Sequence, residues 1–77
     1  MNYYEQSFKR LYENFVFSLT IYHDEHYRKL LLNQMLEKIE TTYQTYKNLG
    51  TAPIYHLTQW KMYYMLKIKQ TYIMNGG

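Results

Sequence analysis

Glycine and proline are almost absent from the interior of this chain, and their scarcity strongly limits what it can fold into. The 77 residues include three glycines and one proline, and two of the glycines are the last two residues. Gly50 and Pro53 therefore mark the one strong internal break. A helix ending near Leu49, with Gly50 just after it, accounts for the glycine. A following helix capped by Thr51, with Pro53 in its first turn, accounts for the proline.

Apolar residues recur every three or four positions on both sides of this break, whereas the alternation typical of strands is absent. At about 100° per residue, they fall on one side of each of three helices. We therefore predict an all-α fold, a compact three-helix bundle forming a single domain over 1–77, with helices at roughly 3–22, 24–49 and 52–74. The expected core stripes are Tyr4, Phe8, Leu11, Tyr12, Phe15, Leu19 and Tyr22; Leu31, Leu32, Met35, Leu36, Ile39, Tyr43 and Tyr46; and Ile54, Leu57, Tyr64, Met65, Ile68 and Tyr72.

The junction between the first two helices is the weaker boundary. Thr20 or Asp24 could cap the second helix, because both side chains can accept a hydrogen bond from a backbone amide. Neither Gly nor Pro enforces a turn between residues 20 and 26. One continuous helix is therefore the alternative, and it would force the chain to pair with another copy.

The small size of the chain favours self-association. A domain of this length has little room for a core, and the absence of cysteine removes both disulfides and thiolate metal sites as supports. We therefore expect a homodimer. Its interface should use large apolar residues that lie off the stripe of the first helix or widen that of the third: Phe17, Ile21, Tyr55, Met62 and Leu66.

The third helix also carries an unusual outer strip. A solvent-facing strip is normally built from Glu and Lys, whereas this one contains Trp, Tyr and His at spacings of three and four. Trp and Tyr are the residues that most often dominate binding energy. We interpret the strip as a binding site for another protein, although packing on a neighbouring helix is the alternative. Its expected contacts are His56, Trp60, Tyr63, Lys67 and Gln70.

Charge is divided unevenly along the chain. All six carboxylates lie in the first 40 residues, so the net charge is −1 there and +4 in the remaining 37. A basic, aromatic surface also suits a nucleic acid. Direct binding of DNA or RNA through Lys61, Lys67 and Lys69 is thus a second hypothesis. Lys61 falls within the apolar arc, where we expect its amine to reach solvent or to pair with Glu37 or Glu40.

No arrangement of residues predicts chemistry. The serines have no His–Asp partners, and no Gly-rich phosphate loop occurs. His23 and His26 flank two carboxylates, but a zinc site needs three or four converging ligands, so a capping segment is the better interpretation. We expect no catalytic residues, no metal and no cofactor.

These observations lead to a functional hypothesis. We expect a small, non-enzymatic regulator that binds another protein and modulates it. The chain is rich in Lys, Ile, Asn and Tyr and poor in Gly, Ala, Arg and Pro, as AT-rich coding would produce. This composition suggests a low-GC bacterium or one of its phages or plasmids as the source. A regulator carried by a phage or plasmid would have a host protein as its target, such as a transcription or replication factor. A structural or assembly component is a third hypothesis. The chain lacks an apolar run long enough to cross a membrane and a secretory signal pattern, so we expect a cytoplasmic location.

Overall fold

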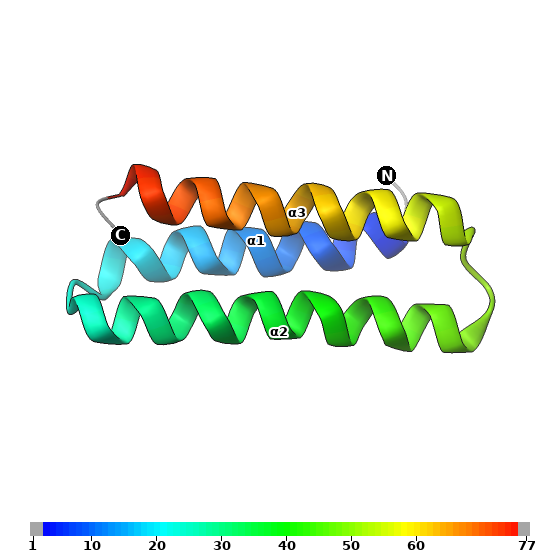
Figure 1. Ribbon diagram of the computed structural model, residues 1–77, viewed down its shortest axis with the longest axis horizontal. Helices are drawn as coiled ribbons and strands as arrows, with labels where there is room; N and C mark the ends of the chain where they lie inside the picture. Colours follow the sequence, from blue (N-terminus) through cyan, green and yellow to red (C-terminus); the bar gives the residue numbers. More distant parts are fainter. Residues whose placement is uncertain (1–2, 76–77) are drawn as a thin grey trace.

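Three helices lie side by side and account for nearly all of residues 3–75, the part of the chain that this computed structural model describes (Figure 1). They are α1 (Tyr3–Ile21), α2 (Glu25–Leu49) and α3 (Ile54–Met74). No strand occurs among the described residues. The prediction of an all-α three-helix bundle is therefore confirmed.

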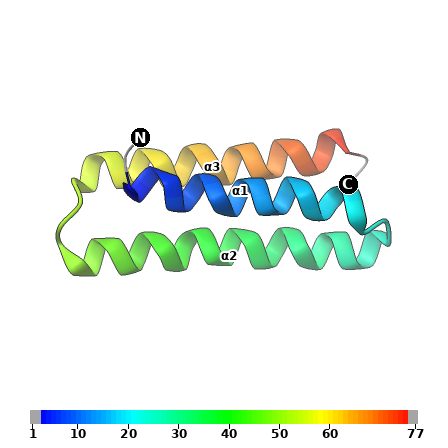
Figure 2. The ribbon, with the colours of Figure 1, turned by 180° about the vertical axis from the view of Figure 1, so that it is seen from behind.

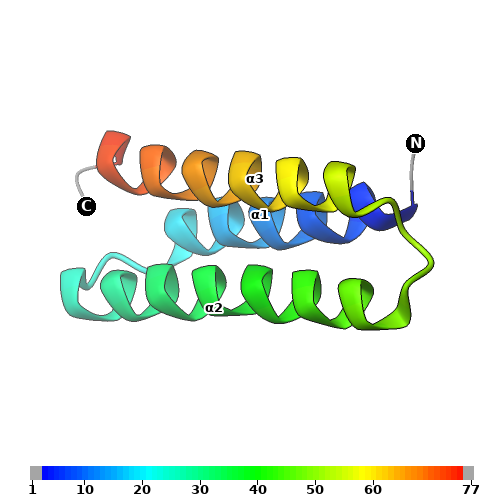
Figure 3. The ribbon, with the colours of Figure 1, turned by 45° about the vertical axis from the view of Figure 1, so that its right-hand side comes forward.

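The three helices form a rod in which each contacts the other two. α2 runs antiparallel to α1 and α3, and Figure 2 shows the same arrangement from behind. Figure 3, turned by 45°, shows α1 beside both α2 and α3. The rod measures 39 × 20 × 16 Å. With such a small cross-section, one side of every helix faces the core and the opposite side faces outward.

The first turn separates α1 from α2, so the alternative of a continuous helix is wrong. Asp24 is the N-cap of α2, and its carboxylate accepts a hydrogen bond of 3.0 Å from the backbone amide of Tyr27. Thr20, the other candidate cap, instead donates its hydroxyl to the carbonyl of Phe17 within α1. The Asp24 cap satisfies one amide at the start of α2 and thereby favours a new helix at this point.

The second turn contains Gly50 and Pro53 but differs from the prediction in detail. Gly50 has a left-handed backbone with φ of 69°, and its amide donates to Tyr46 and Lys47, as expected for the residue that ends a helix. Thr51, predicted as the next N-cap, does not cap α3. Its hydroxyl shares a hydrogen bond of 2.8 Å with that of Tyr4 and joins this turn to α1. Pro53 occupies the N-cap position, so α3 begins at Ile54.

The core follows most of the stripes expected from the sequence, but Tyr22 and Ile54, which were expected in them, are exposed because they lie at helix ends. Tyrosine rings pack in this core while their hydroxyls bridge helices. Tyr43 shares a hydrogen bond with Thr58, and Tyr12 shares one with Thr71. This arrangement lets a tyrosine-rich interior bury rings without leaving the polar atoms unpaired. The buried apolar residues are Phe8, Phe15, Leu19, Met35, Ile39, Tyr43, Leu57, Tyr64 and Ile68.

One buried charge, Arg28, closes the end of the bundle opposite Gly50. Its guanidinium donates to the carbonyls of Leu19 at 2.8 Å, Tyr22 at 2.6 Å and Asn75 at 3.1 Å. These acceptors lie at the carboxyl ends of α1 and α3, where the helix dipole is negative and favours a cation. Arg28 therefore ties together the ends of two parallel helices, a role that the sequence did not predict.

Candidate protein-binding surface

α3 is apolar on the side that faces the core and also on the opposite side. Seven of the fourteen large apolar side chains that are exposed among residues 3–75 lie on this helix, which is one of three. α3 also carries no carboxylate. Because a helix with such an exposed apolar surface is poorly suited to remain in water, α3 is the best candidate for an interface.

The partner strip (His56, Trp60, Tyr63, Lys67 and Gln70) runs along the edge of α3 that borders α1. His56 and Gln70 are exposed, whereas Trp60 is half-buried and packs against the core. The His56 imidazole stacks on the Trp60 indole with ring centroids 5.7 Å apart. Trp60 is thus neither fully buried nor fully exposed, and part of its surface already packs within the chain.

Contacts across this border hold the middle of the partner strip in place. The Lys67 amine donates to the hydroxyl of Tyr63 at 3.3 Å and lies 4.8 Å from the ring centroid of Tyr12 on α1. It also lies 5.4 Å from the ring centroid of Tyr63. Cation–π attraction to two rings restrains the ammonium and the exposed Tyr63 together. The strip therefore presents a tyrosine ring whose position is largely fixed before any partner arrives.

Three of the predicted dimer residues, Tyr55, Met62 and Leu66, share a second line on α3, which faces away from the core. Ile73 extends this line, and the four side chains are 55–72% exposed. We call these four residues the outer stripe. Ile73 was not predicted for the interface, although its spacing of seven from Leu66 could have indicated it.

The other two predicted dimer residues lie elsewhere. Phe17 and Ile21 are exposed on α1, and Phe17 lies about 180° round that helix from the buried Phe8. They occupy the outward side of α1, not that of α3. The structure therefore brings three of the five residues together and leaves the other two on a separate face.

The lysines proposed to bind nucleic acid do not form one patch. Lys61 makes an ion pair of 2.6 Å with Glu40 on α2, as expected, and its amine lies 4.5 Å from the ring centroid of Tyr43. The hydrogen bond from Lys61 is the main reason that the pKa of Glu40 is lowered. Lys67 faces α1, and Lys69 is exposed on the outward side. At about 100° per residue, these three side chains point roughly 80° or more apart.

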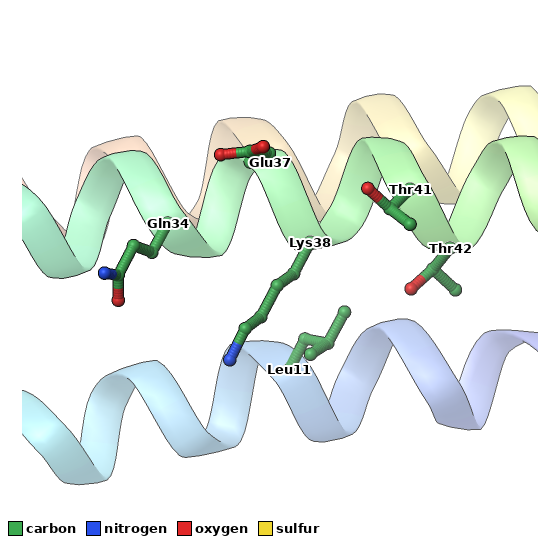
Figure 4. Close-up of a pocket in the computed structure, with 6 residues that line it drawn as sticks. All are labelled: Leu11, Gln34, Glu37, Lys38, Thr41 and Thr42. Atoms are coloured by element: carbon green, nitrogen blue, oxygen red, sulfur yellow. The ribbon is translucent and has the colours of Figure 1, made fainter.

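A shallow groove of about 470 Å³ lies between α1 and α2 (Figure 4). In Figure 4, Lys38 extends from α2 toward α1, and Leu11 points from α1 into the groove. Its walls hold one carboxylate and one ammonium, both on exposed residues. Nothing in this set forms a nucleophile–base pair, so the groove indicates no reaction. It is lined by Leu11, Gln34, Glu37, Lys38, Thr41 and Thr42.

The described part of the chain holds neither a cluster of metal ligands nor a helix that could span a membrane. Residues 3–75 bring together no group of three or more His, Asp or Glu side chains that could hold a metal ion. Asp24, next to His23, instead acts as the N-cap of α2. None of the three helices has a stretch that is both long and apolar enough to cross a membrane.

Comparison with known proteins gives no relative from which a role could be taken. No family model, curated protein or solved structure matches the chain.

Proposed function

We propose that this chain is a non-enzymatic, homodimeric protein that binds another protein through α3. The observation that carries the proposal is the exposed Tyr63 ring, which is held beside Lys67 and Tyr12 at the border of α1 and α3. A rigid aromatic side chain loses little conformational entropy when a partner covers it. Such residues commonly dominate the energy of protein–protein interfaces.

A protein partner fits this surface better than a nucleic acid does. Binding along a phosphate backbone gains affinity from several cations that can each neutralise a phosphate. Here Lys61 is already paired with Glu40, and Lys67 and Lys69 point in different directions. The remaining surface of α3 is apolar and aromatic, which is the composition that the buried centre of a protein interface requires.

We further propose that this binding regulates the partner. Residues 3–75 hold no group of side chains suited to a metal ion, and the lining of the groove between α1 and α2 holds no nucleophile–base pair. These observations support an effect that comes from occupying a surface of the target. The AT-biased composition supports an origin in a low-GC bacterium or in one of its phages or plasmids. On that basis we propose that the chain acts in the cytoplasm on a host transcription or replication factor.

Truncation of Tyr63 provides the experiment. The immobilised chain would be used to capture proteins from a low-GC bacterial lysate, and the affinity for the captured protein would then be measured. Tyr63→Ala should weaken binding by about 30-fold, which corresponds to about 2 kcal/mol. Trp60→Ala is a poorer probe, because Trp60 also packs against the core.

Tyr27→Ala is the matched control. Tyr27 is also an exposed tyrosine in edge contact with a second tyrosine, but it lies on α2, away from the partner strip. Both variants should keep the helicity of the wild type. Equal capture by the two variants would show that Tyr63 does not contact the partner. Binding of DNA or RNA probes at about 50 mM salt would favour the nucleic-acid alternative.

A further inference from the structure

The outer stripe of α3 has the spacing of a helix–helix seam. Gln59 and Lys69 lie on the same line as the four residues of the outer stripe. In the resulting row of six residues, the steps from one residue to the next alternate between four and three. This alternation keeps a row of side chains in line along a helix and is the repeat found where two helices pack together. No other helix of residues 3–75 covers the row. In order, its members are Tyr55, Gln59, Met62, Leu66, Lys69 and Ile73.

We propose that a second copy of this chain covers the outer stripe, with the two α3 helices packed antiparallel. The twofold axis would cross the seam at the level of position 64 along the helix, on the side opposite the buried Tyr64 ring. The inference takes the homodimer of the proposed function as its starting point and assigns its geometry. Tyr55 precedes Tyr64 by the same number of residues as Ile73 follows it, and Met62 and Leu66 are related in the same way. Each of these residue pairs would therefore form two symmetry-related contacts, as a twofold interface requires.

The charges on the seam favour the antiparallel direction. Because α3 has no carboxylate, Lys69 cannot form an ion pair with another α3 helix. In a parallel pair, Lys69 would face the same residue of the second copy. In the antiparallel pair it faces Gln59 of the second copy, and the two lysines lie about 15 Å apart along the axis. That separation exceeds the screening length of about 8 Å at physiological salt.

The available area is sufficient for a small interface. The 21 residues of α3 span about 32 Å. With their flanking residues, the exposed apolar side chains could bury on the order of 600 Å² per copy, near the lower limit for a specific interface. The centre of the partner strip lies roughly 100° round α3 from this seam. Pairing of the stripes would therefore leave Tyr63 at the margin of the dimer.

Disulfide trapping tests the geometry, because the natural chain contains no cysteine. Tyr55→Cys and Ile73→Cys chains would be prepared separately, checked for wild-type helicity, and oxidised alone and as an equimolar mixture. In the antiparallel dimer, position 55 meets position 73 of the second copy, whereas two copies of either position lie about 27 Å apart. We expect a cross-linked dimer from the mixture and little from either variant alone. Phe17→Cys, on the outward side of α1, gives the level of cross-linking that random collisions produce.

Sedimentation of the wild-type chain distinguishes the ways in which the inference could fail. Cross-linking of each variant with itself, without the mixed product, would show a parallel pair and overturn the geometry. The wild type could sediment as a dimer while the cysteine mixture gives no more mixed product than the Phe17→Cys control. That result would overturn the outer stripe as the interface but would leave the homodimer standing. A monomer at every concentration would overturn both. None of these results affects the partner strip, which Tyr63→Ala tests separately.

Discussion

Tyr64 shows how a single residue links the core of this bundle to pH. Its ring is buried and stacks on Phe8 with centroids 6.4 Å apart, while its hydroxyl donates to the Glu5 carboxylate at 3.2 Å. Burial and, secondarily, the negative charge of Glu5 raise the pKa of Tyr64 to about 12. Ionisation of this hydroxyl would place a charge in the core beside a carboxylate, so the folded state retains the proton.

A raised pKa in the folded state makes stability depend on alkaline pH. The contribution of Tyr64 is fully present below its ordinary pKa of 10.0 and is lost as pH rises through about 12. We therefore expect Tyr64→Phe, which cannot ionise, to lose less melting temperature than the wild type between about pH 8 and about pH 11. Tyr63→Phe, which changes an exposed ring, should follow the wild type. Identical pH profiles for all three proteins would contradict this account.

Arg28 is the residue whose loss should damage the fold most at the end opposite Gly50. Arg28→Ala removes a buried cation and leaves the carbonyls of Leu19, Tyr22 and Asn75 without this donor. We expect it to lower the free energy of unfolding by about 3 kcal/mol in denaturant titrations. Arg28→Lys should recover part of this loss, because an ammonium keeps the charge but cannot span all three acceptors. A loss of less than about 0.5 kcal/mol for Arg28→Ala would be typical of an ordinary surface residue and would contradict the assigned role.

At the scale of the elements, Gly50 sets the end of α2. An added Cβ would meet no atom within 4 Å, so the cost of Gly50→Ala should come from the left-handed backbone alone. We expect a loss of about 1 kcal/mol in the free energy of unfolding. Gly50→Asn should lose less, because asparagine tolerates this conformation better. An alanine variant as stable as the wild type would show that this turn can adopt another backbone geometry.

The three helices and their buried faces could be predicted because the period of the apolar residues reports burial directly. The role of Gly50 at the end of α2 could also be predicted, since few other residues favour a left-handed backbone. Thr51 was misassigned because its partner, Tyr4, is 47 positions away and no local pattern connects them. Arg28 was missed for the same reason, since its acceptors are backbone carbonyls that any sequence supplies.

The candidate site could be predicted only in part. Angles around one helix identify residues that share a side, but they do not show where the neighbouring helices lie. Trp60 therefore looked outward in the sequence, whereas in the bundle it is half-buried and packs against the core. Lys67 was expected as an exposed contact and instead packs beside Tyr12 of α1. Spacing alone placed Phe17 and Tyr55 in one interface, although they lie on different helices and face different directions.

At the scale of the whole molecule, the bundle divides its surface by composition. All the carboxylates lie on α1, on α2 or at the N-cap Asp24, whereas α3 has three lysines, no carboxylate and half of the large apolar side chains that are exposed among residues 3–75. The Lys61–Glu40 ion pair links the two parts. In such a thin rod, a helix with two apolar sides can bury only one of them within the chain. The central claim is that another chain covers the second side of α3.

Oxidation of methionine tests this claim most directly. In the single chain, Met62 is 64% exposed and Met74 is 84% exposed, so peroxide should oxidise both if nothing else covers them. Met74 lies off the outer stripe and provides an internal reference. Peptide mass spectrometry would give both rates over a range of protein concentrations. We expect Met62 to become progressively protected as concentration rises while Met74 stays reactive. Oxidation of Met62 about as fast as that of Met74 at every concentration would contradict coverage of α3 by a second copy.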